Sequence, residues 1–334
     1  METRGCVAVV GARGYVGRAL VEGLLDDGWS VRASVRRPGR EVRDVLARQI
    51  LRCGGAVVER RLTASAADVL EKGSLDEALR GADYVVYCVQ PSRKFDKSAV
   101  LRPRQLVVAD AVACVENLAA SVDASGSVRR VIFVGSFEAV SLSPLDKITQ
   151  FSNTHAYSER DWSQPDLSTQ WHALAAQKAE LRITELANAA AGWDMVALVP
   201  GLCLGAQAQE DVLNKYLEGR TEMQIPVVDT SDLVSAAVRS LASPPGRYLL
   251  VAGCLWVSEI RWRIKRAREK ASRKTVFKSL RSRLSLNRSF KPGSDTALNV
   301  HWEFDCSKAI EHLGVSFADV DDTLDAFVQA VVAT

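Results

Sequence analysis

A short apolar run, a turn with three glycines and an amphipathic helical pattern follow one another at the start of the chain. The apolar run covers residues 7–10, and the turn carries Gly11, Gly14 and Gly17. Glycine allows a tight turn, and it lets backbone N–H groups approach an anion at the positive end of the helix dipole. In this context the spacing predicts a fold that binds a dinucleotide by its pyrophosphate. The alternative is a turn whose glycines only allow close packing.

Strand and helix patterns alternate through the first two hundred residues. Each strand candidate is a short apolar, β-branched run, as expected of strands that are buried on both faces of a parallel sheet. The strand candidates cover residues 7–10, 31–35, 57–61, 84–89, 130–134 and 194–199. The helical patterns cover residues 16–27, 41–53, 74–80 and 171–191. Six alternating units predict an α/β fold with right-handed crossovers and a doubly wound parallel sheet, the Rossmann architecture.

The chain after Gly205 is less regular. A helix is predicted from Thr230, because cap-forming residues begin the segment TSDLVSAAVRSLAS. An apolar strand follows at residues 248–251, and two helical segments, SKAIEHLG and DVDDTLDAFVQAVVA, end the sequence. These elements predict a smaller C-terminal α/β lobe.

The predicted elements divide the chain into two parts. Residues 1–205 are expected to form the NAD(P)-binding Rossmann domain, with residues 226–254 returning to pack on it. Residues 206–225 and 255–334 are expected to form the smaller lobe, of the kind that holds a substrate.

Three arginines lie where a dinucleotide would carry a phosphate on its adenine ribose. Arg13 is inside the glycine turn, and Arg36 and Arg37 end the second strand candidate. Proteins that prefer NAD place an acid at that strand end for the ribose hydroxyls, whereas guanidinium groups suit a 2′-phosphate. The sequence therefore favours NADP(H) over NAD(H). The alternative is that these arginines form a solvated surface cluster.

Asp68 follows the third strand candidate, where a carboxylate can accept a hydrogen bond from the adenine amino group. The alternative for Asp68 is a surface loop acid or a helix cap.

The positive charge of the chain is concentrated in one segment. The formal net charge is +3, but the segment from Arg261 to Lys291 holds 13 Lys and Arg residues against one acid, Glu269. The rest of the chain therefore has 30 bases and 39 acids. One interpretation is a solvated surface helix and loop. The other is a docking surface for anionic lipid headgroups or an acidic protein partner, with nucleic acid less favoured because no base-reading motif is present.

Cysteine spacing and hydropathy argue against a disulfide-rich, metal-binding or membrane-spanning protein. The seven cysteines are scattered and have no CxxC spacing, which indicates a reducing intracellular compartment and no disulfide or metal framework. We expect no transmembrane segment, since no stretch approaches the roughly 18 apolar residues that a spanning helix needs. We also expect no targeting leader at the N-terminus.

Several segments together resemble the extended short-chain dehydrogenase/reductase family, in its dihydroflavonol reductase and cinnamoyl-CoA reductase branch. The resemblance runs nearly end to end. It is carried by VAVVGARGYVGRALVEGLL, VRASVRRPG, GSLDEALRGADYVVYCVQPS, RRVIFVGS, SERDWS, LVPGLCLG, VVDTSDLVSAAV, GRYLLVAG and FDCSKAIEHLG. VRASVRRPG and SERDWS narrow the family to this branch.

The resemblance implies a role for individual residues. The family's catalytic serine corresponds to Ser136, and its lysine, which binds the nicotinamide ribose, corresponds to Lys178. The family's tyrosine, four residues before the lysine, corresponds to Leu174. The implied cofactor-binding residues are Gly11, Arg13, Gly14, Tyr15, Val16, Gly17, Arg36, Arg37, Asp68, Val69, Val89, Lys178, Pro200 and Cys203.

Leucine cannot donate a proton to a carbonyl group that is being reduced by hydride, so the sequence predicts the loss of ordinary carbonyl-reductase catalysis. His172 is expected to face away from Lys178, whereas Tyr157, in the loop before the helix, is the candidate substitute acid. The leading hypothesis is an NADP(H)-binding accessory subunit with a structural or sensing role, for which a subunit of mitochondrial respiratory complex I is a family precedent. It would lie in the cytoplasm or, on the accessory-subunit hypothesis, in the mitochondrial matrix. The alternative is an active NADPH-dependent reductase that uses Tyr157 or a water as its acid.

Overall fold

The computed structural model describes residues 4–36, 61–89, 103–142, 155–205, 223–276 and 302–333. Four sequence-based predictions lie outside these residues in whole or in part. They concern the helix at residues 41–53, Arg37, most of the strand at residues 57–61, and the second half of the basic segment.

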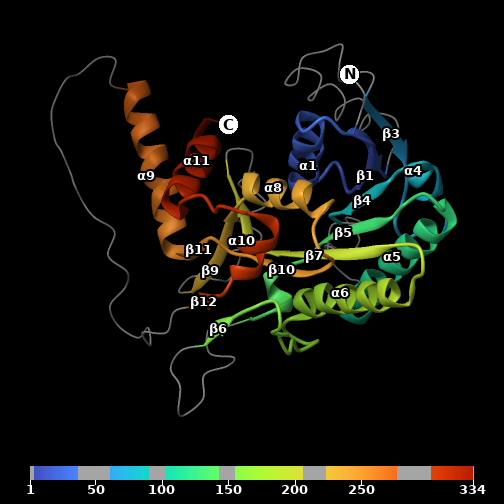
Figure 1. Ribbon diagram of the computed structural model, residues 1–334. Coiled ribbons are helices and arrows are strands. Elements are labelled where there is room, and N and C mark those ends of the chain that lie inside the picture. The colour runs from blue at the N-terminus through green and yellow to red at the C-terminus, as the bar shows by residue number, and fades with distance from the viewer. Residues whose placement is uncertain are drawn as a thin grey trace.

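Seven parallel strands form the central sheet, in the order β10-β7-β5-β4-β1-β2-β3 (Figure 1). Their bounds are β1 Cys6–Val10, β2 Ser30–Val35, β3 Leu62–Ala66, β4 Tyr84–Tyr87, β5 Arg130–Val134, β7 Asp194–Pro200 and β10 Gly246–Leu250. The strand order reverses between β1 and β4, which is where parallel α/β sheets of this kind open a crevice at the carboxyl ends of their strands. The predicted doubly wound α/β fold is confirmed.

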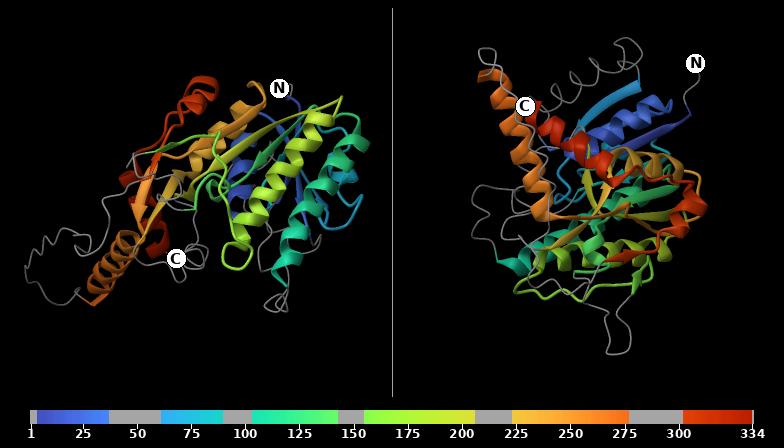
Figure 2. Two further views of the ribbon diagram at one scale, coloured as in Figure 1. Left: turned by 90° about the horizontal axis from the view of Figure 1, so that it is seen from below. Right: turned by 90° about the vertical axis from the view of Figure 1, so that its left-hand side faces the viewer.

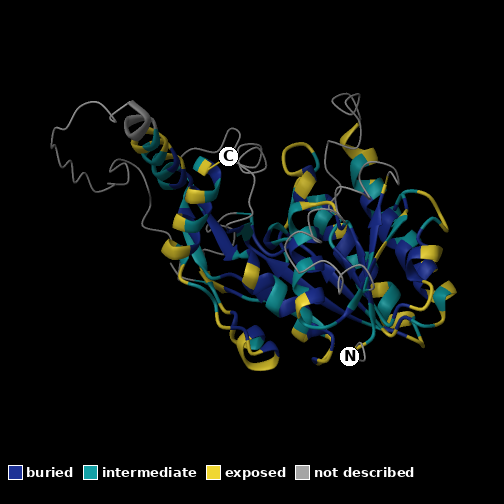
Figure 3. Cartoon of the chain, turned by 90° about the horizontal axis from the view of Figure 1, so that it is seen from above, coloured by how far each residue is buried: buried dark blue, intermediate teal, exposed yellow. Residues whose placement is uncertain are grey.

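Helices cover both faces of this sheet, and alternate residues of each strand contact opposite layers. On β1, Val7 and Val9 pack against one layer, and Ala8 and Val10 against the other. The first layer contains α1 Tyr15–Asp26, α8 Thr230–Ser240 and α10 Ser307–Leu313 (Figure 1). The second contains α4 Asp76–Leu79, α5 Arg104–Ser125 and α6 Trp171–Ala189. Figure 3 shows the buried residues concentrated on the strands and the inner sides of these helices.

The third strand of the described chain, β3, begins at Leu62, directly after the predicted strand at residues 57–61, most of which lies outside the described residues. β3 is the edge strand of the sheet, and only Leu62 in it is fully buried. Because an edge strand need not be apolar on both faces, its sequence, Leu-Thr-Ala-Ser-Ala, does not show the continuous apolar run of the inner strands.

α5 was not predicted from the sequence, because its 22 residues are apolar on most sides and show no clear amphipathic stripe. By length and composition, α5 is the one helix in the described part of the chain that could cross a membrane, and the absence of a transmembrane segment stays a prediction. In this structure α5 packs along α6 and α4, and 44% of its most apolar 18-residue window is buried.

A second, smaller sheet adjoins the first. It has the order β11-β9-β8, with β8 Leu202–Leu204, β9 Gln224–Asp229 and β11 Gly253–Trp256. Two helices cover it, α9 Val257–Val276 and α11 Val320–Ala333, around a separate apolar cluster (Figure 2). Residues 226–254 thus contribute to both parts. β10 is a strand of the large sheet and α8 packs on that sheet, whereas β9 is a strand of the small sheet. A short parallel pair, β6 Ala156–Tyr157 and β12 Glu303–Phe304, lies beside them.

Candidate dinucleotide site and its surroundings

The glycine turn connects β1 to α1 at the carboxyl edge of the sheet. Gly11 has φ of +95°, a conformation that favours glycine, and its carbonyl oxygen accepts the N–H of Gly14 at 2.9 Å. A Cβ atom on Gly17 would lie 2.1 Å from the same oxygen, so α1 can approach the turn only if that position is glycine. Gly14 is the N-cap of α1, and no side chain in the described residues caps this end. The backbone N–H groups of the first turn can therefore bind an anion.

The end of β4 lies directly against this turn. A Cβ atom on Gly11 would be 3.0 Å from Cγ2 of Val89 and 3.2 Å from the sulfur of Cys88. The structure therefore brings together two of the predicted cofactor-binding residues, Gly11 and Val89. Val16, a third, is half-buried and packs into the core below α1.

Tyr15 connects the first turn of α1 to the small sheet. Its hydroxyl donates to Oγ1 of Thr230, and Thr230 in turn donates to the carbonyl oxygen of Leu204 at 2.7 Å. Burial raises the pKa of Tyr15, so this hydroxyl keeps its proton. No local pattern could predict this contact, since Tyr15 and Thr230 are 215 residues apart.

The predicted adenine-ribose residues lie at the strand ends around the turn. Arg13 and Arg36 are both exposed, one in the turn and the other directly after β2. Asp68 is half-buried, and its Oδ1 accepts the backbone N–H of Leu70 at 3.0 Å. This local hydrogen bond leaves the other carboxylate oxygen of Asp68 as a possible acceptor, and its contact with an adenine amino group stays a prediction. Val69 is buried, and its carbonyl oxygen accepts from the amide of Asn117 at 3.0 Å.

Ser136 follows β5 and begins the short 3₁₀ turn η3, Phe137–Ala139. Its Oγ accepts the N–H of Glu138 at 3.3 Å, so the hydroxyl serves as a local cap. α6 packs against η3, which makes α6 the helix whose side chains can reach the surroundings of Ser136.

The orientation of α6 is set by Glu180. Its Oε2 lies 3.2 Å from the position that a Cβ atom on Gly135 would take, so this side of α6 faces the end of β5. Lys178 is two residues earlier, about 200° around the helix, and it is exposed. One turn further on, Arg182 binds Glu116 of α5 at 2.8 Å. The structure therefore does not bring Lys178 and Ser136 together, and the nicotinamide contact of Lys178 stays a prediction.

Leu174 lies one turn before Lys178 and shares its side of the helix. The side of Glu180 continues through Ala176 and Gln177, one turn earlier, and through Ala173 and His172, two turns earlier. α6 contains no tyrosine, and Lys178 is its one lysine. None of these positions thus carries the phenol or the amine that the resemblance implies.

Tyr157, the candidate substitute acid, is 1% exposed. It belongs to an apolar cluster with Phe137 and Trp302, and its ring packs on Phe304 at 5.9 Å between centroids. The structure therefore closes this phenol from solvent.

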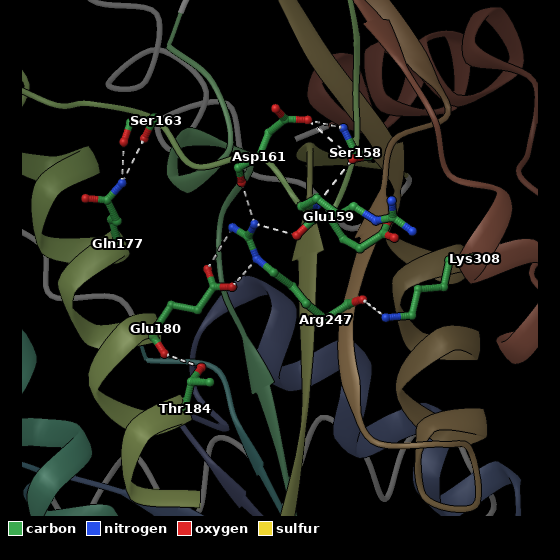
Figure 4. Close-up of polar contacts among 10 residues, drawn as sticks. Ser158, Glu159, Asp161, Ser163, Gln177, Glu180, Thr184, Arg247 and Lys308 are labelled. Atoms are coloured by element: carbon green, nitrogen blue, oxygen red, sulfur yellow. Dashed lines mark hydrogen bonds and ion pairs between the residues drawn. The ribbon is translucent and has the colours of Figure 1, made fainter. Parts of the chain in front are cut away.

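A buried ion pair, Glu180 with Arg247, holds α6 against β10 and the loop after β6 (Figure 4). The side chain of Glu180 is 1% exposed and that of Arg247 is 12% exposed. Arg247 also donates to the carbonyl oxygens of Glu159 at 2.9 Å and of Asp161 at 2.6 Å. Its guanidinium lies 3.8 Å from the ring centroid of Trp162. Arg247 thus binds the loop that carries the SERDWS segment, and Gln177 of α6 also donates to the carbonyl oxygen of Ser163 at 2.5 Å (Figure 4).

The residues after β7 lead directly into the small sheet, whose strand β8 begins at Leu202. Pro200 ends β7, and a Cβ atom on Gly201 would be 2.9 Å from the backbone of Pro226. Burial raises the pKa of the Cys203 thiol to about 12, so this thiol stays protonated and unreactive at neutral pH. Among the described residues, no group of three or more His, Cys, Asp or Glu side chains could hold a metal ion.

Comparison with known proteins agrees with this architecture. Residues 3–154 match the NmrA-like family. Cinnamoyl-CoA reductase 1 of Petunia hybrida is 31% identical over 75% of this chain and 73% of its own length. Tetraketide alpha-pyrone reductase 1 of Arabidopsis thaliana is 25% identical over 99% of this chain and 96% of its own length. Among solved structures, Gre2 of Candida albicans in complex with NADPH has a TM-score of 0.75 at 17% identity, covering 98% of each chain.

The fold and the glycine turn define a reductase-like protein of the dinucleotide-binding α/β class. More specifically, the chain belongs to the extended short-chain dehydrogenase/reductase family, in the branch of the dihydroflavonol and cinnamoyl-CoA reductases.

Proposed function

We propose that this protein binds NADP(H) at the glycine turn and holds it without ordinary carbonyl reduction. On this proposal it serves as a structural or sensing accessory subunit of a larger assembly, in the cytoplasm or, as part of a respiratory complex, in the mitochondrial matrix. The exposed guanidinium groups of Arg13 and Arg36 and the uncapped N-terminus of α1 support cofactor binding. The NADPH complex of the Candida Gre2, a protein of similar fold, agrees with it.

The loss of turnover is inferred from the residues on the Glu180 side of α6, the side that lies against Gly135. Reduction of a carbonyl by hydride requires a proton for the oxygen, and a positioned acid contributes about 10²–10⁴-fold to such a step. On that side Ala176 cannot donate a proton, and His172 is an exposed imidazole packed on Trp171, not the phenol that the family uses. α6 contains no tyrosine. Bound NADPH would supply hydride chemistry, but the residues around Ser136 do not complete it.

The cofactor preference can be tested at Arg36. We expect Arg36→Glu to weaken NADPH binding about 10–100-fold, because a charge-assisted hydrogen bond to the 2′-phosphate is worth about 1.5–3 kcal/mol. NADH binding should change little, since NADH lacks that phosphate. Isothermal titration with both nucleotides makes the measurement, and Arg80→Glu, an exposed arginine at the end of α4, is the matched control. Equal affinity of the unaltered protein for NADH and NADPH would contradict the preference.

Turnover can be tested by placing a tyrosine at either of two positions on α6, residue 172 together with a lysine at residue 176, or residue 174 before Lys178. We expect the unaltered protein to show no NADPH oxidation with a panel of aldehydes and ketones, even at about 1 s⁻¹, the low end of the usual enzyme range. His172→Tyr with Ala176→Lys places a phenol and an amine on the side that faces Gly135, and activity should appear there if the rest of the site is intact. Leu174→Tyr, on the other side of α6, should add none.

The competing function is an active NADPH-dependent carbonyl reductase, which the names of its relatives favour. Turnover by the unaltered protein would establish this function and overturn the proposal. Activity in Leu174→Tyr alone would show instead that α6 presents Leu174 and Lys178 to the cofactor.

The accessory role is tested separately by native gel migration of the tagged protein from its source, where the proposal expects a species much larger than the single chain.

A further inference from the structure

α9 lies at the outer edge of the small lobe, and one of its sides is fixed by packing (Figure 2). Ile260 and Ile264 are buried in the apolar cluster that also contains Leu324 and Phe327 of α11. The apolar stripe of α9 is therefore already covered by this chain, and it does not explain the charge of the helix.

The base next to α11 is neutralised by acids. Arg263 binds Glu259 of its own helix at 2.8 Å and Asp325 of α11 at 2.9 Å, and it also contacts Asp321. This cluster holds α9 against α11 and accounts for one base of the segment.

The opposite side of α9 carries further bases in a row. Arg261, Lys265 and Arg268 are exposed and are spaced by four and three residues, so they lie along one side over about 10 Å. Trp262 is about 200° around the helix from Ile260, and the guanidinium of Arg266 lies 4.9 Å from its ring centroid. The outward surface of α9 therefore combines a line of positive charge with a tryptophan.

We propose that this surface of α9, with the row Arg261, Lys265 and Arg268, docks on the surface of a bilayer that contains anionic lipids. A straight row of bases complements a flat sheet of negative headgroups, and basic helices with an outward tryptophan suit the headgroup region. The rest of the chain has more acids than bases, 39 against 30. Its repulsion from the same surface would orient the protein with α9 towards the membrane.

Vesicle sedimentation of the full chain tests this proposal. The probe is phosphatidylcholine vesicles with and without phosphatidylserine, at low and at physiological salt. We expect binding only with phosphatidylserine, weakened by salt. The triple variant Arg261→Glu, Lys265→Glu, Arg268→Glu should bind about a hundredfold more weakly, since each base near an anionic surface contributes about 1 kcal/mol.

The matched control carries the same change of charge elsewhere. Lys72→Glu, Arg80→Glu and Arg160→Glu alter three exposed bases outside α9, and we expect vesicle binding to persist. Both variants should keep NADPH affinity, so failure here is distinguishable from failure of the proposed function. Equal loss in both variants, binding to vesicles without phosphatidylserine, or tighter binding to an oligonucleotide than to the anionic vesicles would each overturn the proposal.

Discussion

Gly17→Ala is expected to abolish NADPH binding and to destabilise the fold by about 3 kcal/mol. The added Cβ would lie 2.1 Å from the carbonyl oxygen of Gly11 and 2.9 Å from Cα of Ala12. Both are backbone atoms, so α1 must move away from the turn to relieve the overlap. Overpacking of this kind costs about 1–3 kcal/mol, and more where the surroundings are rigid. The displacement also moves the N–H groups that would hold the pyrophosphate.

The measurement is thermal unfolding with and without NADPH, because a ligand that binds the folded state stabilises it by an amount that grows with the logarithm of its concentration over its Kd. Gly192→Ala is the control: a Cβ atom there meets nothing within 4 Å, and Gly192 does not have a positive φ. We expect this control to keep both its stability and its stabilisation by NADPH. If Gly17→Ala retained the full stabilisation by NADPH, the dinucleotide would not lie at this turn.

The parts of the fold that were predictable are those with a local pattern. β1, the glycine turn and α1 are contiguous, and the apolar periodicity and the glycines agree on one interpretation there. β5 and the start of α6 were placed to the residue for the same reason. Edge strand β3 and helix α5 lack such a pattern, since β3 is half-exposed and the polar residues of α5 do not gather on one side.

The candidate site was predictable only in its glycine half. Spacing along α6 could identify Lys178 as the helix's one lysine, but not which side of α6 faces Gly135. That orientation depends on Glu180 and Arg247, which are 67 residues apart. A signal for Glu180 existed in the sequence, because it shares its side of the helix with the apolar residues Ala176 and Ile183. The partner Arg247 could not have been named without the fold.

The Glu180–Arg247 pair is the second position where a large effect is expected. Burial raises the pKa of the Glu180 carboxyl above its usual value, and the guanidinium of Arg247 acts in the opposite direction. Removing Arg247 leaves a buried carboxylate without its partner, and it also frees the carbonyl oxygens of Glu159 and Asp161. Breaking a buried ion pair from one side costs about 3–5 kcal/mol.

We therefore expect Arg247→Ala to lower the free energy of unfolding by about 4 kcal/mol at neutral pH, measured by urea denaturation. Without the guanidinium, the Glu180 pKa rises further in the folded state, so the folded protein binds a proton more tightly than the unfolded chain. The deficit should thus be smallest below the unfolded value of 4.5 and should grow as pH rises through the folded pKa. Arg182→Ala, which breaks an exposed pair on the same helix, is the control and should cost less than about 1 kcal/mol at any pH. Equal, pH-independent losses in the two variants would show that Arg247 does not hold Glu180 in place against Gly135.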